Sequence, residues 1–196
     1  MINTNINTNI NRNINRKQNK GFTLVEMLVA VSILSLSILA AFTSISNNIK
    51  TARFSEDKVV AYYLASEAIE YIRNVRDENA IRNIQQLPFG AFTNWLRDIS
   101  SSISDPCYNR NCIVDTIANS IAPCSSDHNS CPFLKKHPTS KIYGYNNVWT
   151  QSIFKRSVSV SVISATEAVV TATVTWTASN GDSKTYTLSE IIRNWQ

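Results

Sequence analysis

The apolar positions of the chain follow three successive patterns, and the first is an uninterrupted apolar run. It extends from residue 22 to residue 42, and its polar members are Thr23, Glu26, Ser32, Ser35 and Ser37. A helix rises about 1.5 Å per residue, so a run of this length spans roughly 30 Å, the hydrocarbon thickness of a bilayer. The run therefore predicts a membrane-spanning helix.

Two kinds of polar side chain interrupt this run. The hydroxyls are compatible with a membrane because each can donate to the carbonyl one helical turn earlier. Glu26 is different, because a charge at a bilayer centre costs about 2.5–3.5 kcal/mol and intramembrane carboxylates usually have a function. Its place near the helix end lowers that cost. A signal anchor that tolerates Glu26 at the interface is therefore an alternative to a functional carboxylate.

The second pattern continues the helix beyond the membrane. Residues 46–84 contain neither Pro nor Gly, whereas Pro88 and Gly90 follow shortly after. Apolar residues recur there at spacings of three and four, which predicts one buried helical face: Val60, Tyr63, Leu64, Ala68, Tyr71, Ile72 and Val75. We expect one helix from residue 22 to about residue 77. Its charges, with Glu67 and Glu70 near Arg73 and Arg76, fit ordinary helix-surface pairs.

The third pattern is strict alternation near the C-terminus. Segments 153–164, 167–178 and 183–192 place their apolar residues on one face and Ser or Thr on the other, which predicts an antiparallel sheet with one packed face. Residues expected on that face include Val158, Val160, Val162, Val170, Ala172, Val174, Trp176, Tyr186 and Leu188. Asn180-Gly181 predicts a hairpin turn. Asp182 beside Asn180 could suggest calcium, but turn chemistry explains both residues.

Charge is concentrated at the start of the chain. Of the 19 Lys and Arg residues, four lie in residues 1–20, which contain no acid, and 15 follow against 14 acidic residues. The first 17 residues are an Asn/Ile/Thr repeat that buries little apolar surface, which predicts disorder. Basic residues beside an apolar span keep that side of it cytoplasmic. Four charges are few for a nucleic-acid-binding arm, so we predict no nucleic-acid partner.

The basic N-terminal segment meets the apolar run in the sequence "KGFTLVEMLVAVSIL", residues 20–34. It resembles the class III signal of type IV pilins and of the pseudopilins of type II secretion, from Lys20 to about Phe42. The resemblance implies that a prepilin peptidase cuts the Gly21–Phe22 bond and that the new amine of Phe22 is N-methylated. The leader of 21 residues is longer and more repetitive than in many members of the family.

The same resemblance gives Glu26 a role in assembly. In a filament core the positive amine of Phe22 would be costly without a partner, and Glu26 of a neighbouring subunit would compensate it and set the register. Gly21 would serve the peptidase, because a residue without a side chain fits a narrow pocket and favours an extended backbone. Expected partners are the prepilin peptidase, other pilin or pseudopilin subunits and the inner membrane.

The resemblance also implies an extracytoplasmic location for the four cysteines, where disulfides persist. Their spacing does not match a zinc finger. Two disulfides are favoured, with local pairing of Cys107 to Cys112 and of Cys124 to Cys131 as the first of three connectivities. A zinc site that uses His128 or His137, and free thiols, are the alternatives.

The expected fold class is pilin-like α+β, with a long N-terminal helix packed on a C-terminal antiparallel sheet of three or four strands. The expected segments are a cleaved leader (1–21), a membrane and filament-core helix (22–45), its soluble half (46–87), an irregular Cys-bearing region (88–153) and the sheet (154–196).

The function expected is that of a structural subunit, minor or at the tip, of a type IV pilus or secretion pseudopilus. It would enter the inner membrane once, with the N-terminus cytoplasmic, and then join an extracytoplasmic filament. No nucleophile elbow, C-x-x-C pair or Gly-rich phosphate loop indicates an enzyme, a metal site or a cofactor. The alternative is a membrane-anchored extracytoplasmic domain that binds DNA or a surface ligand without joining a filament.

Overall fold

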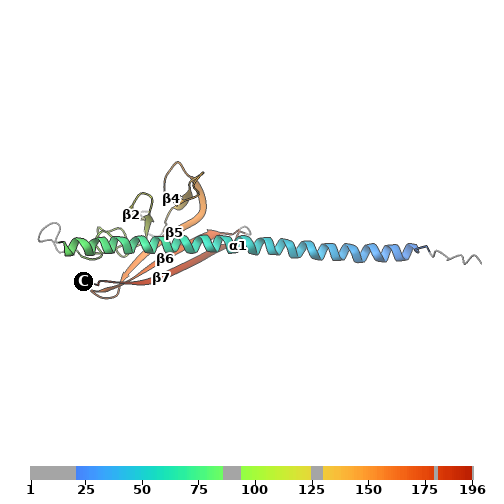
Figure 1. Ribbon diagram of the computed structural model, residues 1–196, viewed down its shortest axis with the longest axis horizontal. Coiled ribbons are helices and arrows are strands. Elements are labelled where there is room, and N and C mark those ends of the chain that lie inside the picture. Colours follow the sequence, from blue (N-terminus) through green and yellow to red (C-terminus); the bar gives the residue numbers. More distant parts are fainter. Residues whose placement is uncertain (1–20, 86–93, 125–129, 179–180, 196) are drawn as a thin grey trace, which may run out of the picture. The chain divides into compact units, whose positions relative to one another are not determined.

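A computed structural model describes residues 21–85, 94–124, 130–178 and 181–195 of the chain. It contains one long helix, α1 (Leu24–Ile84), and a sheet of seven strands (Figure 1). The strands are β1 (Cys112–Asp115), β2 (Ser120–Pro123), β3 (Phe133–Lys136), β4 (Tyr143–Gly144), β5 (Thr150–Val162), β6 (Glu167–Thr177) and β7 (Ser183–Arg193). The chain forms two compact units, residues 1–47 and 48–196, and α1 contributes to both.

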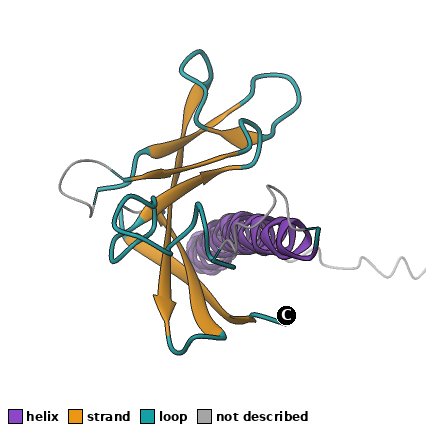
Figure 2. Cartoon of the chain, turned by 90° about the vertical axis from the view of Figure 1, so that its left-hand side faces the viewer, coloured by secondary structure: helices purple, strands orange, loops and turns teal. Residues whose placement is uncertain are grey.

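The three long strands β5, β6 and β7 form an antiparallel meander beside the second half of α1 (Figures 1 and 2). Their registers align Val158 with Ala172 and Ala172 with Leu188, so the apolar positions of the three strands share one face. That face is the core of the unit, as the alternation predicts. Val162 is the exception, because it ends β5 and is 53 % exposed.

The hairpin between β6 and β7 lies where Asn180-Gly181 predicts it. Gly181 adopts a φ of +86°, a conformation that glycine reaches without steric cost. Its N–H donates to the carbonyl of Ala178, and the Ala178 N–H donates to the carbonyl of Asp182. Asn180 itself lies outside the described residues.

The sheet is larger than the three or four strands expected. Segment 88–153, expected to be irregular, contributes the four short strands β1 to β4 and the start of β5. The 13-residue strand β5 pairs with β6 along one edge and with β1 and β3 along the other. Strands of two to four residues carry too little alternation to be visible in a sequence, and β5 is the template that orders them.

The second half of α1 buries a stripe with helical spacing, which confirms the amphipathic pattern. Its fully buried residues include Ala61, Leu64, Ala65, Ala68, Ile69 and Ile72. The expectation for Tyr63 was wrong, because this ring is 66 % exposed and packs edge-on against Tyr62. The helix extends to Ile84, seven residues beyond the expected end, and Pro88 and Gly90 lie outside the described residues.

Both disulfides of the structure are local. Cys107 joins Cys112 at the entrance to β1, and Cys124 joins Cys131 between β2 and β3. This is the pairing favoured by the sequence, and it leaves no free thiol among the described residues. His128 lies outside the described residues, whereas His137 accepts the backbone N–H groups of Thr139 and Ser140 through Nδ1.

Two ion pairs among the described residues join α1 to the sheet: Arg73 pairs with Glu190 of β7, and Glu67 pairs with Arg156 of β5. The second pair differs from the surface pairing expected for Glu67. Arg156 is 1 % exposed on the core face of β5, and its Nη1 lies 2.9 Å from Glu67 Oε2. The same guanidinium donates to the carbonyls of Leu64 and Val114. Glu70 does form the expected surface pair, with Arg73 one turn later on α1.

Candidate functional site at the N-terminus of the helix

The N-terminus of α1 is fixed by a side-chain cap. The Glu26 N–H donates to Oγ1 of Thr23 at 3.2 Å, and the Met27 N–H donates to the Thr23 carbonyl. Thr23 is therefore the N-cap residue and Glu26 is the third residue of the helix. The sequence T-x-x-E at this position is that of a capping box, in which the acidic side chain can in turn reach the N–H of the cap residue.

Gly21 and Phe22 lie just ahead of that cap, outside the helix. The peptide bond between them is thus not part of the helical hydrogen-bond ladder. A Cβ built on Gly21 would meet no other atom within 4 Å, and no left-handed φ occurs there. Nothing in the described chain therefore requires glycine at residue 21.

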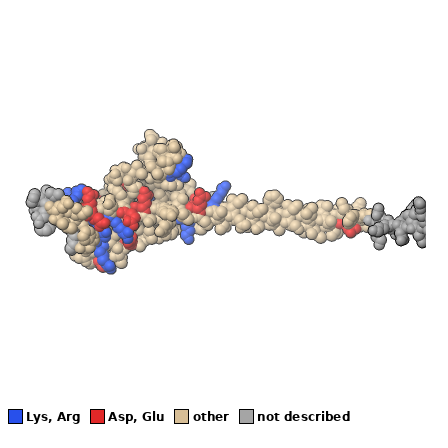
Figure 3. Space-filling model, viewed as in Figure 1, with Lys and Arg blue, Asp and Glu red and all other residues tan. Residues whose placement is uncertain are grey.

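The first part of α1 presents apolar side chains on all its faces. Phe22 and Leu24 are each 77 % exposed, and every described residue of this unit is exposed. Figure 3 shows this stretch as a surface of uncharged residues with one acidic position near its start. It is the one helix of the described chain that is long and apolar enough to cross a membrane.

The hydroxyls inside this stretch are satisfied internally, as expected from their spacing. Ser32, Ser35 and Ser37 each donate at 2.8 Å to the carbonyl four residues earlier. A helix in a bilayer must satisfy its polar groups in this way, because hydrocarbon offers no partner. The serines therefore do not prevent burial of this helix in lipid or among apolar helices.

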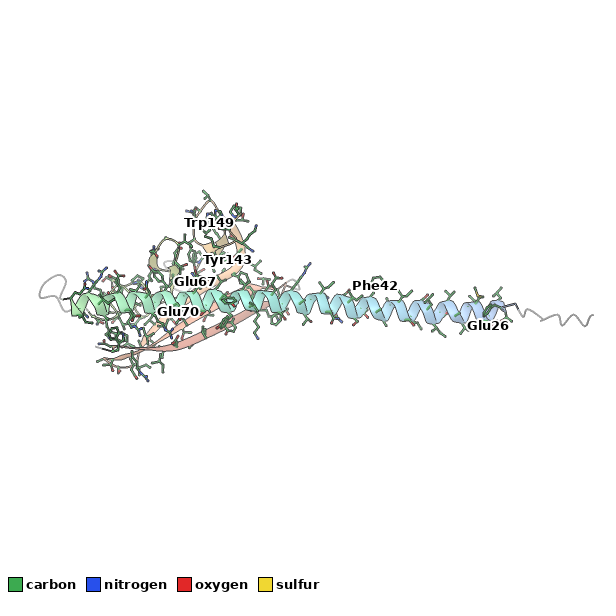
Figure 4. All side chains as sticks on the ribbon, in the orientation of Figure 1. Glu26, Phe42, Glu67, Glu70, Tyr143 and Trp149 are labelled. Atoms are coloured by element: carbon green, nitrogen blue, oxygen red, sulfur yellow. A yellow bond between two sulfur atoms is a disulfide. The ribbon has the colours of Figure 1, made fainter. Side chains whose placement is uncertain are left out.

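Glu26 is the charged residue of this surface, and Figure 4 shows it at the start of α1. Among the described residues no cation forms an ion pair with its carboxylate. Its place in the first helical turn is favourable, because the N-terminal end of a helix carries a partial positive charge worth about 0.3–1 kcal/mol to an acid. The cap thus places Glu26 in the first turn of α1, four residues after Phe22.

Thr23 has a structural role at this site that its polar character within the apolar run does not by itself reveal, because it caps α1. The signal was available, because Thr followed three residues later by Glu immediately before an apolar run predicts a helix start. The cap links three expected site residues: it ends the helix before the Gly21–Phe22 bond and fixes Glu26 in the first turn.

Comparison with known proteins bears on this same segment. Residues 16–42 match the family model described as the prokaryotic N-terminal methylation motif. Curated proteins and solved structures gave no match to the chain. The matched segment contains the basic residues of the leader end, the Gly21–Phe22 bond, the cap and Glu26. The chain therefore carries the class III signal of type IV pilins and pseudopilins, followed by a long apolar helix and a pilin-like α+β fold.

Proposed function

We propose that this protein is the precursor of a minor or tip subunit of a type IV pilus or a type II secretion pseudopilus. A prepilin peptidase would cut it after Gly21, and the N-terminal helix would carry it into the filament. One observation carries this proposal: the N-terminal methylation motif leads into the first, apolar part of α1, where every described residue up to residue 47 is exposed and the carboxylate of Glu26 has no ion-pair partner among the described residues.

The exposed apolar part of α1 fits a bilayer first and a filament core afterwards. An apolar surface on every face is unstable in water, and burial stabilises it by roughly 25 cal/mol per Å². A bilayer provides that burial first, and a bundle of identical or related helices provides it later. The internal bonds of the three serines suit both environments, because lipid and packed helices alike offer those hydroxyls no partner.

Glu26 fits a filament core better than it fits a lipid bilayer. A lone carboxylate has no benefit in lipid, whereas the amine created at Phe22 needs a negative partner once water is excluded. Within one chain the cap holds Glu26 near the same helix end, so the amine of one subunit and the carboxylate of the next would meet if neighbouring helices are staggered. We infer that this pairing sets the axial register of the filament.

The remaining chain supports a structural role. The motif is that of structural subunits, and the unit 48–196 is built around one helix–sheet core. Its two disulfides fit an extracytoplasmic location, because disulfides persist outside the cytoplasm. A nearly neutral domain with a disulfide-tied region fits a low-abundance subunit more closely than a bulk shaft subunit.

Immunogold labelling of sheared filaments tests this proposal. An antibody against the unit 48–196 should label filaments at sparse positions or at one end in the wild type. Dense labelling along the shaft would contradict the minor role and retain the filament role. A protein that stays entirely in the membrane fraction, with bare filaments, would instead favour the membrane-anchored binding domain.

A further inference from the structure

A cleft of about 420 Å³ lies in the unit 48–196, between the turn that joins β1 to β2 and the segment that joins β4 to β5. Its volume is within the range of about 300–1,000 Å³ that is usual for small-molecule sites. Trp149, labelled in Figure 4, comes from the second of these segments. Asp115 comes from the end of β1, and it is the charged member of the seven lining residues.

Gly144 in β4 lies next to three residues that line this cleft, Trp149, Asp115 and Ile117. A Cβ at this buried position would lie 3.1 Å from Cζ3 of Trp149 and 3.5 Å from both Oδ1 of Asp115 and Cγ1 of Ile117. The first distance is too short for an undistorted contact. Glycine therefore lets the indole ring and the carboxylate approach the same point of the sheet from two different segments.

The polar side chains of the cleft are each anchored at one atom. Asp115 Oδ1 accepts the N–H groups of Ile117 and Ala118 at 3.1 and 3.2 Å. Asn146 Oδ1 accepts the N–H of Val148 at 3.0 Å, and Asn147 Oδ1 accepts from Nζ of Lys135 at 2.7 Å. These bonds hold the side chains in place before any ligand arrives, which lowers the entropy cost of binding.

The opposite ends of these side chains have no partner. Within the described part of the chain no hydrogen bond reaches Oδ2 of Asp115, Nδ2 of Asn146, Nδ2 of Asn147 or Nε1 of Trp149. The cleft thus offers one acceptor, two amide donors and one indole donor around a flat apolar ring. His137 meets that ring edge-on at 5.0 Å between centroids, which fixes its orientation.

These hydrogen-bonding groups of the cleft argue against several classes of ligand. An anion would face the carboxylate of Asp115, and the ammonium of Lys135, which lies next to the lining, is already bound to Oδ1 of Asn147. A cation would suit Asp115 and Trp149 but would meet the positive ends of the two amide groups. A purely apolar ligand would leave four polar groups desolvated and unpaired, at a cost.

A neutral polyol satisfies every group at once, because each hydroxyl both donates and accepts. A pyranose ring adds a face of C–H groups that can lie on the indole. We propose that this cleft is a binding site for a neutral saccharide, with Trp149 as the stacking surface and Asp115, Asn146 and Asn147 as the hydroxyl partners. The site is independent of the N-terminal motif, and it would give an exposed subunit a contact with carbohydrate.

The test uses the full chain in lipid nanodiscs that were prepared without sugar-based detergents. The protein is applied to immobilised neutral oligosaccharides built from glucose, galactose, mannose and N-acetylhexosamines, with sialylated and sulfated oligosaccharides for comparison. Free methyl glycosides are then added as competitors. Competition by a free glycoside indicates a monosaccharide site, and its absence indicates a site for longer chains; the proposal holds in both cases.

Three variants make the test specific. Trp149→Ala should abolish binding, whereas Trp195→Ala should leave it unchanged, because Trp195 is an exposed indole outside the cleft. Asn147→Asp keeps the oxygen that accepts from Lys135 and replaces the amide donor with a charged acceptor oxygen, so it should fold normally and weaken binding about tenfold. The proposal is overturned if no neutral saccharide binds at millimolar concentration, if acidic oligosaccharides bind better, or if Trp149→Ala or Asn147→Asp binds like the wild type.

Discussion

Arg156 Nη1 lies 2.9 Å from Glu67 Oε2, and this ion pair joins the central strand of the sheet to the core face of α1. Glu67 also accepts a bond from the Thr116 hydroxyl, which follows β1. One carboxylate thus connects the helix, the long strand β5 and the short strand β1. The buried guanidinium makes this connection a requirement of the fold, because a buried charge without its partner is costly.

Glu67→Ala should therefore destabilise the unit 48–196. Loss of one partner of a buried pair costs about 3–5 kcal/mol. We expect about 2 kcal/mol here, because Glu67 is 39 % exposed and solvent screens part of the charge. Arg156 also keeps its bonds to two carbonyls. The measurement is thermal or denaturant unfolding of the full chain in nanodiscs, followed by tryptophan fluorescence.

Glu70→Ala is the matched control for this prediction. Glu70 lies one helical turn from Glu67 on α1 and pairs with Arg73 at the surface, with 61 % of its own side chain exposed. Exposed pairs contribute about 0–1 kcal/mol, so this variant should unfold almost like the wild type. Equal destabilisation by both substitutions would show that the pair between Glu67 and Arg156 contributes no more to the free energy of unfolding than a surface pair does.

The buried arginine also shows where sequence reasoning succeeds and where it stops. The alternation of β5 and β6 assigned the valines to one face correctly, and the same parity places Arg156 on that face. The contradiction between a charge and an apolar face is visible in the sequence, but its partner Glu67 lies 89 positions earlier. Only the docking of α1 on the sheet brings the two together.

The short strands and the turns around Trp95 were beyond prediction for a related reason. Trp95, Leu96 and Ile99 enter the core from a series of turns, without helical or strand periodicity. Strands β1 to β4 depend on pairing with β5 or with one another. By contrast, the N-terminal methylation motif was visible in the sequence, because it is defined by the local spacing of residues such as Gly21, Phe22 and Glu26.

Peptide mapping without reduction should join Cys107 to Cys112 and Cys124 to Cys131. Digestion with trypsin and with a protease that cuts before Asp places each cysteine on its own peptide. The four peptides are residues 105–110, 111–114, 115–126 and 127–135. We expect the first to remain linked to the second and the third to the fourth. A link between the first and the fourth peptide would contradict the structure.

Removal of the first disulfide, with Cys107→Ser and Cys112→Ser together, should lower the free energy of unfolding by about 2 kcal/mol. This value is the loop-entropy effect expected for a closed loop of this length. Both residues are fully buried, so the serine hydroxyls add a desolvation cost. The same unfolding assay measures it, and an unchanged midpoint would contradict a structural role for this bond.

Glu26→Gln separates the two roles proposed for Glu26, in the helix cap and in filament assembly. Glutamine can still complete the capping box with Thr23, but it carries no charge to meet an amine. We expect the variant to be cleaved and inserted like the wild type, while its amount in sheared filaments falls at least tenfold. Glu26→Ala should show the same defect, together with a loss of about 1 kcal/mol at the helix start.

Glu56→Gln is the control for this experiment, because Glu56 is an exposed acid of the same helix outside the matched motif. It should enter filaments normally. Normal incorporation of Glu26→Gln would reject charge pairing as the basis of register and would leave the cap as the role of Glu26.

Gly21→Val should block cleavage without disturbing the fold. The structure has open space around Gly21 and no left-handed φ there, so a side chain meets no obstacle within the described chain. Any loss of processing must then arise in the peptidase. Immunoblotting should detect only the uncut precursor, and circular dichroism of that precursor should match the wild type. Efficient cleavage of the variant would show that the peptidase does not require glycine at residue 21.

The most direct test of the central claim is mass spectrometry of the N-terminus of the protein purified from its native membrane. We predict a mature chain that begins at Phe22, with one methyl group on its amine and none of residues 1–21 retained. Detection of an intact chain that still begins at Met1 as the stable form would contradict the proposal that this protein is a prepilin.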